Sequence, residues 1–533
     1  MMFRLVLAGL FVCATPGCVN RAAAPERSDL LVIATTVEPP SLNPLYLQGR
    51  DAADVGALGY SGLTTYDRRG AIVADVATVV PTMANGGISR DGKRIVFHLR
   101  RGVRWQDGYP LTARDVVFSY RANTNPSNAT PSQSFDTGIA RVWAPDSYTV
   151  VAELTRPQAA FVTSFFGGDG GSILPAHLLA AYPNLNHVAF NAAPIGSGPY
   201  RFTKWMRGER LDLSANDHYY GTKPAIRHLS IRFVDSQSTI TNELMSNEVD
   251  ATFFANPSKI AALRSVPDHR VIVTFVPSFG TIVFNLRDPI LRDPAVRRAF
   301  ALAIDRHTLV AKAAFGLYDP DTGMRGMFTW AYDPHAGTIA YNPARARARL
   351  SDDGWIPGAD GIRVKNRRRL ELQLVFSAQI SIFDEAAPLM VEEARAIGVD
   401  LVIRQYERRV LWSLDGPLYE GRFQTALLNL QNGLDPDPST FLSCDQRPPI
   451  GFNFARYCNV AVDRALQRAA SVYDRAERRR IYSFVQRRLL ADVPHYFLWQ
   501  PSEIDVIPTA LRGYEFSPGG GPYSSVAHWR LQQ

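Results

Sequence analysis

Strand and helix patterns alternate along both halves of this chain, and no other feature of the sequence constrains its fold as strongly. The chain has 533 residues, and a single hydrophobic core stops growing at about 250–300 residues. We therefore expect a mixed α/β protein with two lobes, each built on its own sheet, and a ligand crevice between them. Apolar alternation or short β-branched runs predict strands at Leu30–Ala34, Ile95–Leu99, Thr149–Leu154, Leu229–Val234, Val271–Val276, Leu370–Phe376 and Leu401–Tyr406.

Capping residues mark where helices begin. Thr112 and Asp115 form a capping-box pattern. Asp293-Pro294 and Asn342-Pro343 each place a capping side chain before a proline at the first helical position. The first of these predicts one helical stretch over residues 295–315. The amphipathic pattern of residues 460–491 predicts two helices.

Residues 1–18 are typical of a bacterial export signal. Arg4 precedes the apolar run Leu5–Ala14, which is too short to span a bilayer as a helix. The run leads to Cys18, in a context similar to a lipobox, although Thr15 stands where leucine is usual. We expect Cys18 to be lipidated, with ordinary signal cleavage as the alternative, and residues 19–27 to form a tether.

Two cysteines of the exported part can pair. Export permits disulfides, and a bond between Cys444 and Cys458 would close a loop of about 15 residues, worth about 3 kcal/mol. Two free thiols are the alternative.

Several classes of function lack their characteristic residues. The formal charge is +8, but the arginine runs are short and lack interleaved aromatics, so we expect no nucleic acid partner. Residues 87–94 nearly match a phosphate-binding loop, yet Arg94 replaces the required Ser or Thr, and Asp91-Gly92 predicts a hairpin turn. No G-x-S-x-G, CxxC or HExxH motif occurs, so we expect no metal site and no cofactor.

Residues 88–120, ISRDGKRIVFHLRRGVRWQDGYPLTARDVVFSY, resemble the signature of the peptide/nickel-binding family of bacterial extracytoplasmic solute-binding proteins, which serve ABC importers. Other stretches resemble the same family in the same order along the chain. They are residues 37–44 (VEPPSLNP), 196–200 with Trp205, 216–220, 248–250, Asn285, 294–299, 303–306 and 434–442.

The resemblance implies a type II periplasmic-binding-protein fold, with two hinged lobes and an extra subdomain on lobe I. It assigns residues 28–62, 195–272 and 500–533 to lobe I, residues 63–194 to the subdomain and residues 273–499 to lobe II. It also implies that Cys444 and Cys458 match a cysteine pair of dipeptide-binding members.

The resemblance further implies where a ligand binds. In peptide-binding members an aspartate near the late D-P segment pairs with the ligand's α-ammonium. The usual register places Leu434 at that position, whereas an alternative register uses Asp435; a turn before proline is the structural alternative for Asp435. Packing or surface roles are likewise the alternatives for the other candidates. The candidate ligand-binding residues are Asp435, Asn432, Gln431, Ser278, Phe279, Gly280, Thr281, Trp330 and Arg404.

The function implied by the resemblance is capture of a solute, most simply a short peptide, without a chemical step. The expected partners are ABC permease subunits, and the expected state is an extracytoplasmic, lipid-anchored monomer. Alternatives are another solute, such as a nickel chelate or an oligosaccharide, or a sensor role. A less favoured alternative is an extracytoplasmic hydrolase.

Overall fold

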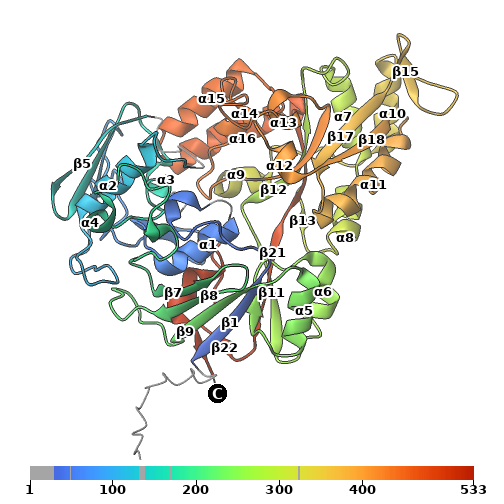
Figure 1. Cartoon of the computed structure of the whole chain (residues 1–533). Coiled ribbons are helices and arrows are strands. Elements are labelled where there is room, and N and C mark those ends of the chain that lie inside the picture. Colours follow the sequence, from blue (N-terminus) through green and yellow to red (C-terminus); the bar gives the residue numbers. More distant parts are fainter. Residues whose placement is uncertain (1–28, 48–49, 131–137, 169–170, 322–323, 533) are drawn as a thin grey trace, which may run out of the picture.

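The computed structural model of the chain describes residues 29–47, 50–130, 138–168, 171–321 and 324–532. Figure 1 shows two lobes, one above the other, with a third body beside them. The predicted two-lobed α/β fold is thus confirmed. We call the part built on the seven-stranded sheet lobe I, the part built on the six-stranded sheet lobe II, and the part around the sheet β4-β6-β5 the subdomain. The predicted signal, Cys18 and the whole of the predicted tether lie outside the described residues.

The sheet of lobe I has the order β11-β21-β10-β1-β9-β8-β7. Its centre is parallel, since β1 pairs in parallel with both β9 and β10. Leu31, Ile33 and Ile231 bury their side chains in its core. The strands are β1 (Leu30–Thr35), β7 (Tyr200–Met206), β8 (Arg210–Ala215), β9 (His228–Phe233), β10 (Ala251–Thr252), β11 (His269–Phe275) and β21 (Ser502–Pro508), with helices α1 (Arg50–Gly59), α5 (Gln237–Met245) and α6 (Ile260–Leu263).

The subdomain contains β4 (Arg94–His98), β5 (Ile139–Asp146) and β6 (Thr149–Leu154), with the helices α2 (Ala113–Thr124), α3 (Phe161–Ser164) and α4 (Ala176–Leu179). Asp115 accepts the backbone N–H of Thr112 at 2.8 Å, so the expected helix start is confirmed. The stretch that resembles a phosphate-binding loop is a turn before β4. Gly92, at φ +69°, donates its N–H to the Ser89 carbonyl at 2.8 Å.

Lobe II has the sheet order β13-β20-β12-β19-β17-β18 and carries helices on both faces. One face packs against α7, α8, α10 and α11, and the other against α9 and α12 to α16. The strands are β12 (Ser278–Phe284), β13 (Asp319–Pro320), β17 (Glu371–Ser377), β18 (Asp400–Tyr406), β19 (Thr425–Gln431) and β20 (His495–Gln500). The helices are α7 (Pro294–Ala303), α8 (Arg306–Ala313), α9 (Arg325–Phe328), α10 (Pro343–Asp352), α11 (Ser381–Arg395), α12 (Arg408–Leu411), α13 (Pro417–Glu420), α14 (Ser439–Leu442), α15 (Val460–Ser471) and α16 (Arg475–Asp492).

Most predicted elements are present. Each of the seven predicted strands agrees with an observed strand to within two residues at either end, and residues 460–491 form two helices as expected. The single helical stretch expected over residues 295–315 is wrong. Asp305 accepts the backbone N–H of His307 at 3.0 Å, so it caps a new helix, α8, and the chain turns between α7 and α8.

Two short segments connect the lobes. β11 of lobe I continues into β12 of lobe II through Val276 and Pro277, and β20 of lobe II returns to β21 of lobe I through Pro501. The segments lie side by side, because the Gln500 side-chain amide donates to the Val276 carbonyl at 2.9 Å. The Val276 N–H donates to the Pro501 carbonyl at 3.3 Å. These two crossings form the hinge.

Among the described helices, none combines the length and the apolar character that a bilayer span requires.

Candidate functional site

A cavity of about 530 Å³ opens between the lobes beside the hinge. Its walls come from the segments that follow β10 and β17, from the start of β21, and from Gln237 of α5, Tyr318 and Asn429 of β19. A volume of this size is within the range of small-ligand sites. The lining residues are Gln237, Phe254, Ala255, Asn256, Pro257, Tyr318, Gln379, Ile380, Ser381, Ile382, Asn429, Ser502, Glu503 and Ile504.

Hydrogen bonds tie the two walls of this cavity together. The Ser381 hydroxyl of lobe II donates to the Asn256 side-chain oxygen of lobe I at 3.1 Å. The Ser502 hydroxyl of lobe I donates to the Leu317 carbonyl of lobe II at 2.7 Å. The lobes are therefore in contact around the cavity.

None of the nine candidate residues is among the described residues that line the cavity. Four of them lie on or next to the strand pair β12–β19, whose Asn429 does line it: Ser278, Gly280, Gln431 and Asn432. Ser278 is opposite Gln431 in the register, and its hydroxyl donates to the Leu430 carbonyl at 2.9 Å. Gln431 lies on the same face of β19 as Asn429, which lines the cavity. Asn432 is held by two bonds, from its N–H to the Pro277 carbonyl at 3.2 Å and from its side chain to the Met327 carbonyl at 2.8 Å.

Gly280 leaves space for the Trp499 side chain, which contacts a residue of the cavity wall. A Cβ at Gly280 would lie 2.0 Å from Trp499 Nε1, so only glycine permits this approach. Trp499 Nε1 in turn donates to the Asn429 side-chain oxygen at 3.0 Å and thereby orients a residue of the cavity wall.

Three other candidates lie elsewhere. Phe279 and Thr281 are both 0% exposed. Phe279 packs in the core beneath α9, and Thr281 donates to the Tyr496 carbonyl at 3.1 Å. Arg404 is exposed on β18, the outer strand of the sheet, away from the hinge.

Asp435 is engaged within lobe II. Its Oδ1 lies 2.7 Å from Arg478 Nη1 and accepts the Trp330 indole N–H at 3.2 Å. The guanidinium is only 3% exposed and also donates to the Pro436 carbonyl at 3.1 Å. Burial raises the pKa of the Asp435 carboxyl, and the Arg478 charge opposes that rise. A ligand ammonium would have to compete with this arginine.

Leu434, the neighbour of Asp435, crosses to the other side of the cleft. A Cβ at Gly70 of the subdomain would lie 3.1 Å from Leu434 Cδ1, and one at Gly519 would lie 2.8 Å from it. The Leu434 side chain thus packs closely against these two glycines.

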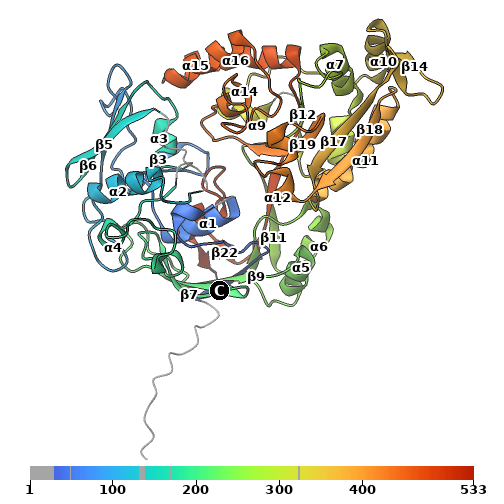
Figure 2. The ribbon, with the colours of Figure 1, turned by 45° about the horizontal axis from the view of Figure 1, so that its top comes forward.

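The subdomain and lobe II also touch at the rim of the cleft. Ala159 of the subdomain donates its N–H to the Ala470 carbonyl of α15 at 2.7 Å. In Figure 2, α15 and α16 reach from lobe II toward the subdomain. Lobe II therefore contacts lobe I beside the cavity and the subdomain at the rim, so the lobes are in a closed arrangement.

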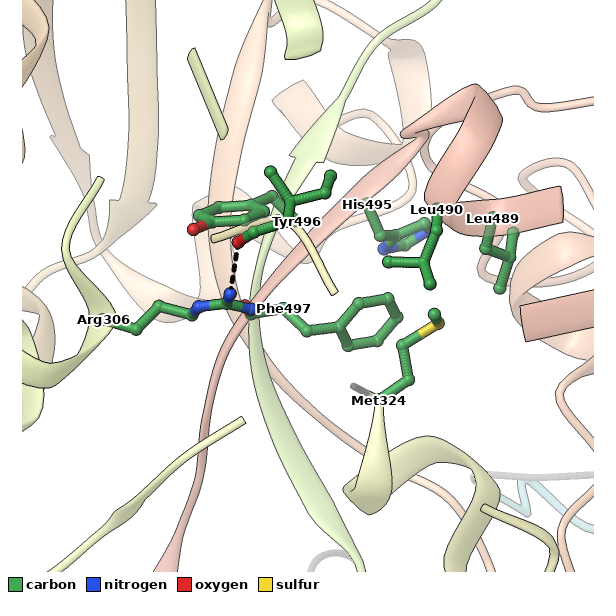
Figure 3. Close-up of a pocket in the computed structure, with 8 residues that line it drawn as sticks. Arg306, Met324, Leu489, Leu490, His495, Tyr496 and Phe497 are labelled. Atoms are coloured by element: carbon green, nitrogen blue, oxygen red, sulfur yellow. Dashed lines mark hydrogen bonds between the residues drawn. The ribbon is translucent and has the colours of Figure 1, made fainter. Parts of the chain in front are cut away.

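A second, much smaller cavity of about 10 Å³ lies inside lobe II (Figure 3). His495, Phe497, Leu490 and Met324 surround it. Burial lowers the pKa of His495 to about 4, so the ring is neutral. In the described part of the chain, no three His, Cys, Asp or Glu side chains gather as a metal site.

Sequence reasoning missed the residues that line the larger cavity. A usable signal exists, since ligands in α/β proteins bind outside the carboxyl ends of parallel strands. The segments after β10 and β17, residues 253–257 and 378–382, follow such ends, because β10 is parallel to β1 and β17 is parallel to β18.

Comparison with known proteins agrees with this architecture. The family model described as "Bacterial extracellular solute-binding proteins, family 5 Middle" matches residues 78–447. The oligopeptide-binding protein AppA of Bacillus subtilis is 25% identical, with 99% of this chain and 98% of that protein covered. The crystal structure of NikZ from Campylobacter jejuni in complex with Ni(L-His) is 27% identical, has a TM-score of 0.80 and covers 94% of this chain and 99% of that one. The structure of AppA from Bacillus subtilis in complex with a nonapeptide has a TM-score of 0.78 at 22% identity, covering 95% and 99%.

Proposed function

This chain belongs to family 5 of the bacterial extracellular solute-binding proteins, and from that premise we propose that it captures short peptides between its lobes and delivers them to an importer in the membrane. The cavity whose walls come from both lobes carries the proposal. A ligand there contacts both lobes only when they are closed, so binding and closure are coupled.

The energetics of closure set what the ligand must supply. A ligand moves the lobes only if it binds the closed form better than the open one. A shift from 1:99 to 99:1 needs about 5.5 kcal/mol of differential affinity, and a micromolar ligand has about 8 kcal/mol in total. Binding alone is sufficient, and the peptide leaves unchanged.

Ser278, Gln431 and Asn432 are proposed to face the peptide backbone. Gln431 is exposed and continues the face of β19 on which Asn429 lines the cavity. A peptide with one end in the cavity would extend past this end of β19. Its backbone amide groups would then lie next to the polar side chains of Ser278, Gln431 and Asn432.

The remaining parts of the proposal concern the cell. Lipidation at Cys18 would hold the protein at the outer surface of a membrane, where ABC permease subunits would recognise the closed lobes. One chain supplies both walls of the cavity, so a monomer suffices. No nucleic acid partner and no cofactor are needed for capture and release.

A second candidate is a metal chelate. It is favoured by the likeness to NikZ, which was crystallised with Ni(L-His). Neutral polar groups such as Gln237, Asn256 and Gln379 line the cavity and could accept either ligand. Elemental analysis of the purified protein separates the two.

The test is native mass spectrometry of the freshly purified chain, followed by incubation with an equimolar tripeptide library. We expect bound peptides that are recovered uncleaved. Ser381→Trp fills the cavity and should abolish retention, whereas Ser265→Trp, at an exposed position of lobe I, should not. Shortened peptides would overturn the proposal in favour of a hydrolase. Bound metal without peptide would overturn it in favour of the chelate.

A further inference from the structure

Three arginines lie near one another at the end of lobe II away from the hinge. β12 starts at the hinge, and Arg287 follows its far end. Arg447 and Arg456 belong to the loop that the disulfide between Cys444 and Cys458 closes. None of these arginines is among the described residues that line the interlobe cavity. The group is therefore separate from the site of the proposed function.

Backbone hydrogen bonds hold the segments that carry the three arginines. Leu286 donates its N–H to the Ala455 carbonyl at 3.0 Å, and Asn453 donates its N–H to the Gln446 carbonyl at 2.9 Å. Leu286 and Ala455 directly precede two of the arginines, and Gln446 directly precedes the third. The first bond joins the end of β12 to the disulfide-closed loop, and the second joins the two sides of that loop.

The guanidinium of Arg456 has a defined place in this arrangement. Its Nη2 donates to the Tyr419 carbonyl at 2.9 Å, and the residue is 8% exposed. A Cβ at Gly421 would lie 2.5 Å from Nη2, and Gly421 has φ +73°, so glycine leaves the space that the guanidinium occupies. Arg456 itself has φ +56°, a left-handed conformation that is uncommon for a residue with a long side chain.

Positive charge outweighs negative charge around Arg456. Burial, and after it the charges of Arg287 and Arg447, lower the pKa of the Arg456 guanidinium, whereas Glu420 opposes this effect. The Glu420 carboxylate is exposed and lies 3.9 Å from Arg422. Within the described ranges, none of the three arginines forms an ion pair with a carboxylate.

Two donors of this group have no acceptor in the part of the chain that the structure describes. They are the Nε–H groups of Arg447 and Arg456, and both are shielded from solvent. A buried donor without an acceptor is unfavourable, and a donor on a charged group is more so. Arg287 is exposed and Arg447 is half-buried, so this group of arginines extends from the interior to the surface.

We infer that Arg287, Arg447 and Arg456 form a binding site for a phosphate group at the end of lobe II away from the hinge. A phosphate monoester carries about 1.5–2 negative charges at neutral pH and three strong acceptor oxygens. It therefore matches three guanidinium groups better than a carboxylate, which has one charge and two oxygens. Arginine suits this role because its planar N–H groups bind phosphate oxygens in pairs.

The phosphate group can belong to a small anion or to a lipid head group, because both present the same oxygens. The first arm of the experiment titrates the full chain with sodium phosphate at constant ionic strength and reads the heat by calorimetry. A hydrogen bond between charged groups contributes about tenfold or more in affinity. We expect Arg287→Gln and Arg447→Gln each to bind phosphate at least about tenfold more weakly than the wild type. Arg395→Gln, which removes an exposed arginine of α11, should bind it as the wild type does.

The second arm identifies the source of the phosphate group. It measures cosedimentation of the full chain with phosphatidylcholine vesicles that contain or lack phosphatidic acid, whose head group is a phosphate monoester. Saturable heat from inorganic phosphate would assign the site to a small anion. Binding to phosphatidic acid vesicles without such heat would assign it to a lipid head group, and Arg287→Gln should then weaken vesicle binding by the same factor.

The inference is overturned if the wild type binds neither probe, or if Arg287→Gln and Arg447→Gln bind as tightly as Arg395→Gln. Thermal unfolding monitors the folding of each variant. The Arg287 side chain makes no hydrogen bond or ion pair with any described residue, so Arg287→Gln decides the matter should Arg447→Gln not fold. Peptide retention should be unchanged in all three variants, so failure of the phosphate site leaves the proposed function standing.

Discussion

The Tyr473 hydroxyl of lobe II donates a hydrogen bond of 3.0 Å to the Gly92 carbonyl of the subdomain. The tyrosine lies between α15 and α16, and the glycine lies in the turn before β4. A Cβ at Gly92 would stand 2.8 Å from the Tyr473 ring, so the two also pack closely. This pair closes the rim of the cleft at a distance from the hinge.

Removing this hydroxyl should favour the open form. Tyr473→Phe keeps the ring and removes one cross-cleft hydrogen bond, worth about 1 kcal/mol, which corresponds to about fivefold in the closing equilibrium. Small-angle scattering should report a larger radius of gyration without peptide and a higher peptide concentration for half-closure. Tyr182→Phe, at a half-exposed position of the subdomain, is the control. Identical scattering curves and affinities for Tyr473→Phe and the wild type would show that the bond does not hold the rim.

The Asp435–Arg478 pair should matter for stability. Asp435→Ala leaves a buried guanidinium without its carboxylate, which costs about 3–5 kcal/mol. Urea unfolding should show this loss, and the double variant Asp435→Ala/Arg478→Met should recover most of it. The double variant should also bind peptide as the wild type does. A tenfold weaker affinity in this folded double variant would instead show that Asp435 contributes to ligand binding.

His495 should make the protein sensitive to acid. The ring nitrogens have no hydrogen-bond partner among the described residues, and burial lowers the pKa to about 4 from 6.5. The unfolded chain therefore binds the proton first, so the stability that the neutral ring provides is lost as the pH falls from about 6.5 toward 4, by about 3 kcal/mol in total.

The matched variant for this prediction is His495→Leu. Urea unfolding at a series of pH values between neutral and about 4 should show a flatter dependence for the variant than for the wild type. Parallel curves for the two proteins would mean that His495 does not titrate in this window.

The disulfide should stabilise lobe II. Cys444 and Cys458 are bonded, with Cα atoms 4.6 Å apart and a sequence separation of 14. Opening a loop of this length costs about 3 kcal/mol through the entropy of the unfolded chain. Cys444→Ala/Cys458→Ala should lose that amount in urea unfolding, and a reductant should lower the wild type to the same level. Wild-type stability that is insensitive to reductant would contradict this.

Local structure was largely predictable because its signals are local. The cap at Asp293 and the turn at Gly92 each depend on a few neighbouring residues, and both occur as expected. The sequence predicted one uninterrupted helix over residues 295–315, because a single aspartate such as Asp305 is compatible with a helix interior. Only the structure shows that the Asp305 side chain caps the new helix α8.

The site was predictable only in part. The D-P segment lies on the hinge side of lobe II. No pattern near Asp435 in the sequence indicates that its partner is Arg478, which follows 43 positions later on α16. The cavity combines residues 254–257, 379–382 and 502–504, and only the folded chain brings these three segments together.

The hinge described above has a mechanical consequence. Its two crossings are hydrogen-bonded to each other at Val276, so we expect them to bend together as one pivot. In such bending, displacement grows with distance from the pivot. A small separation of the lobes beside Glu503 therefore becomes a wide separation at Tyr473. The distance across the rim is thus a sensitive measure of whether the cavity is occupied.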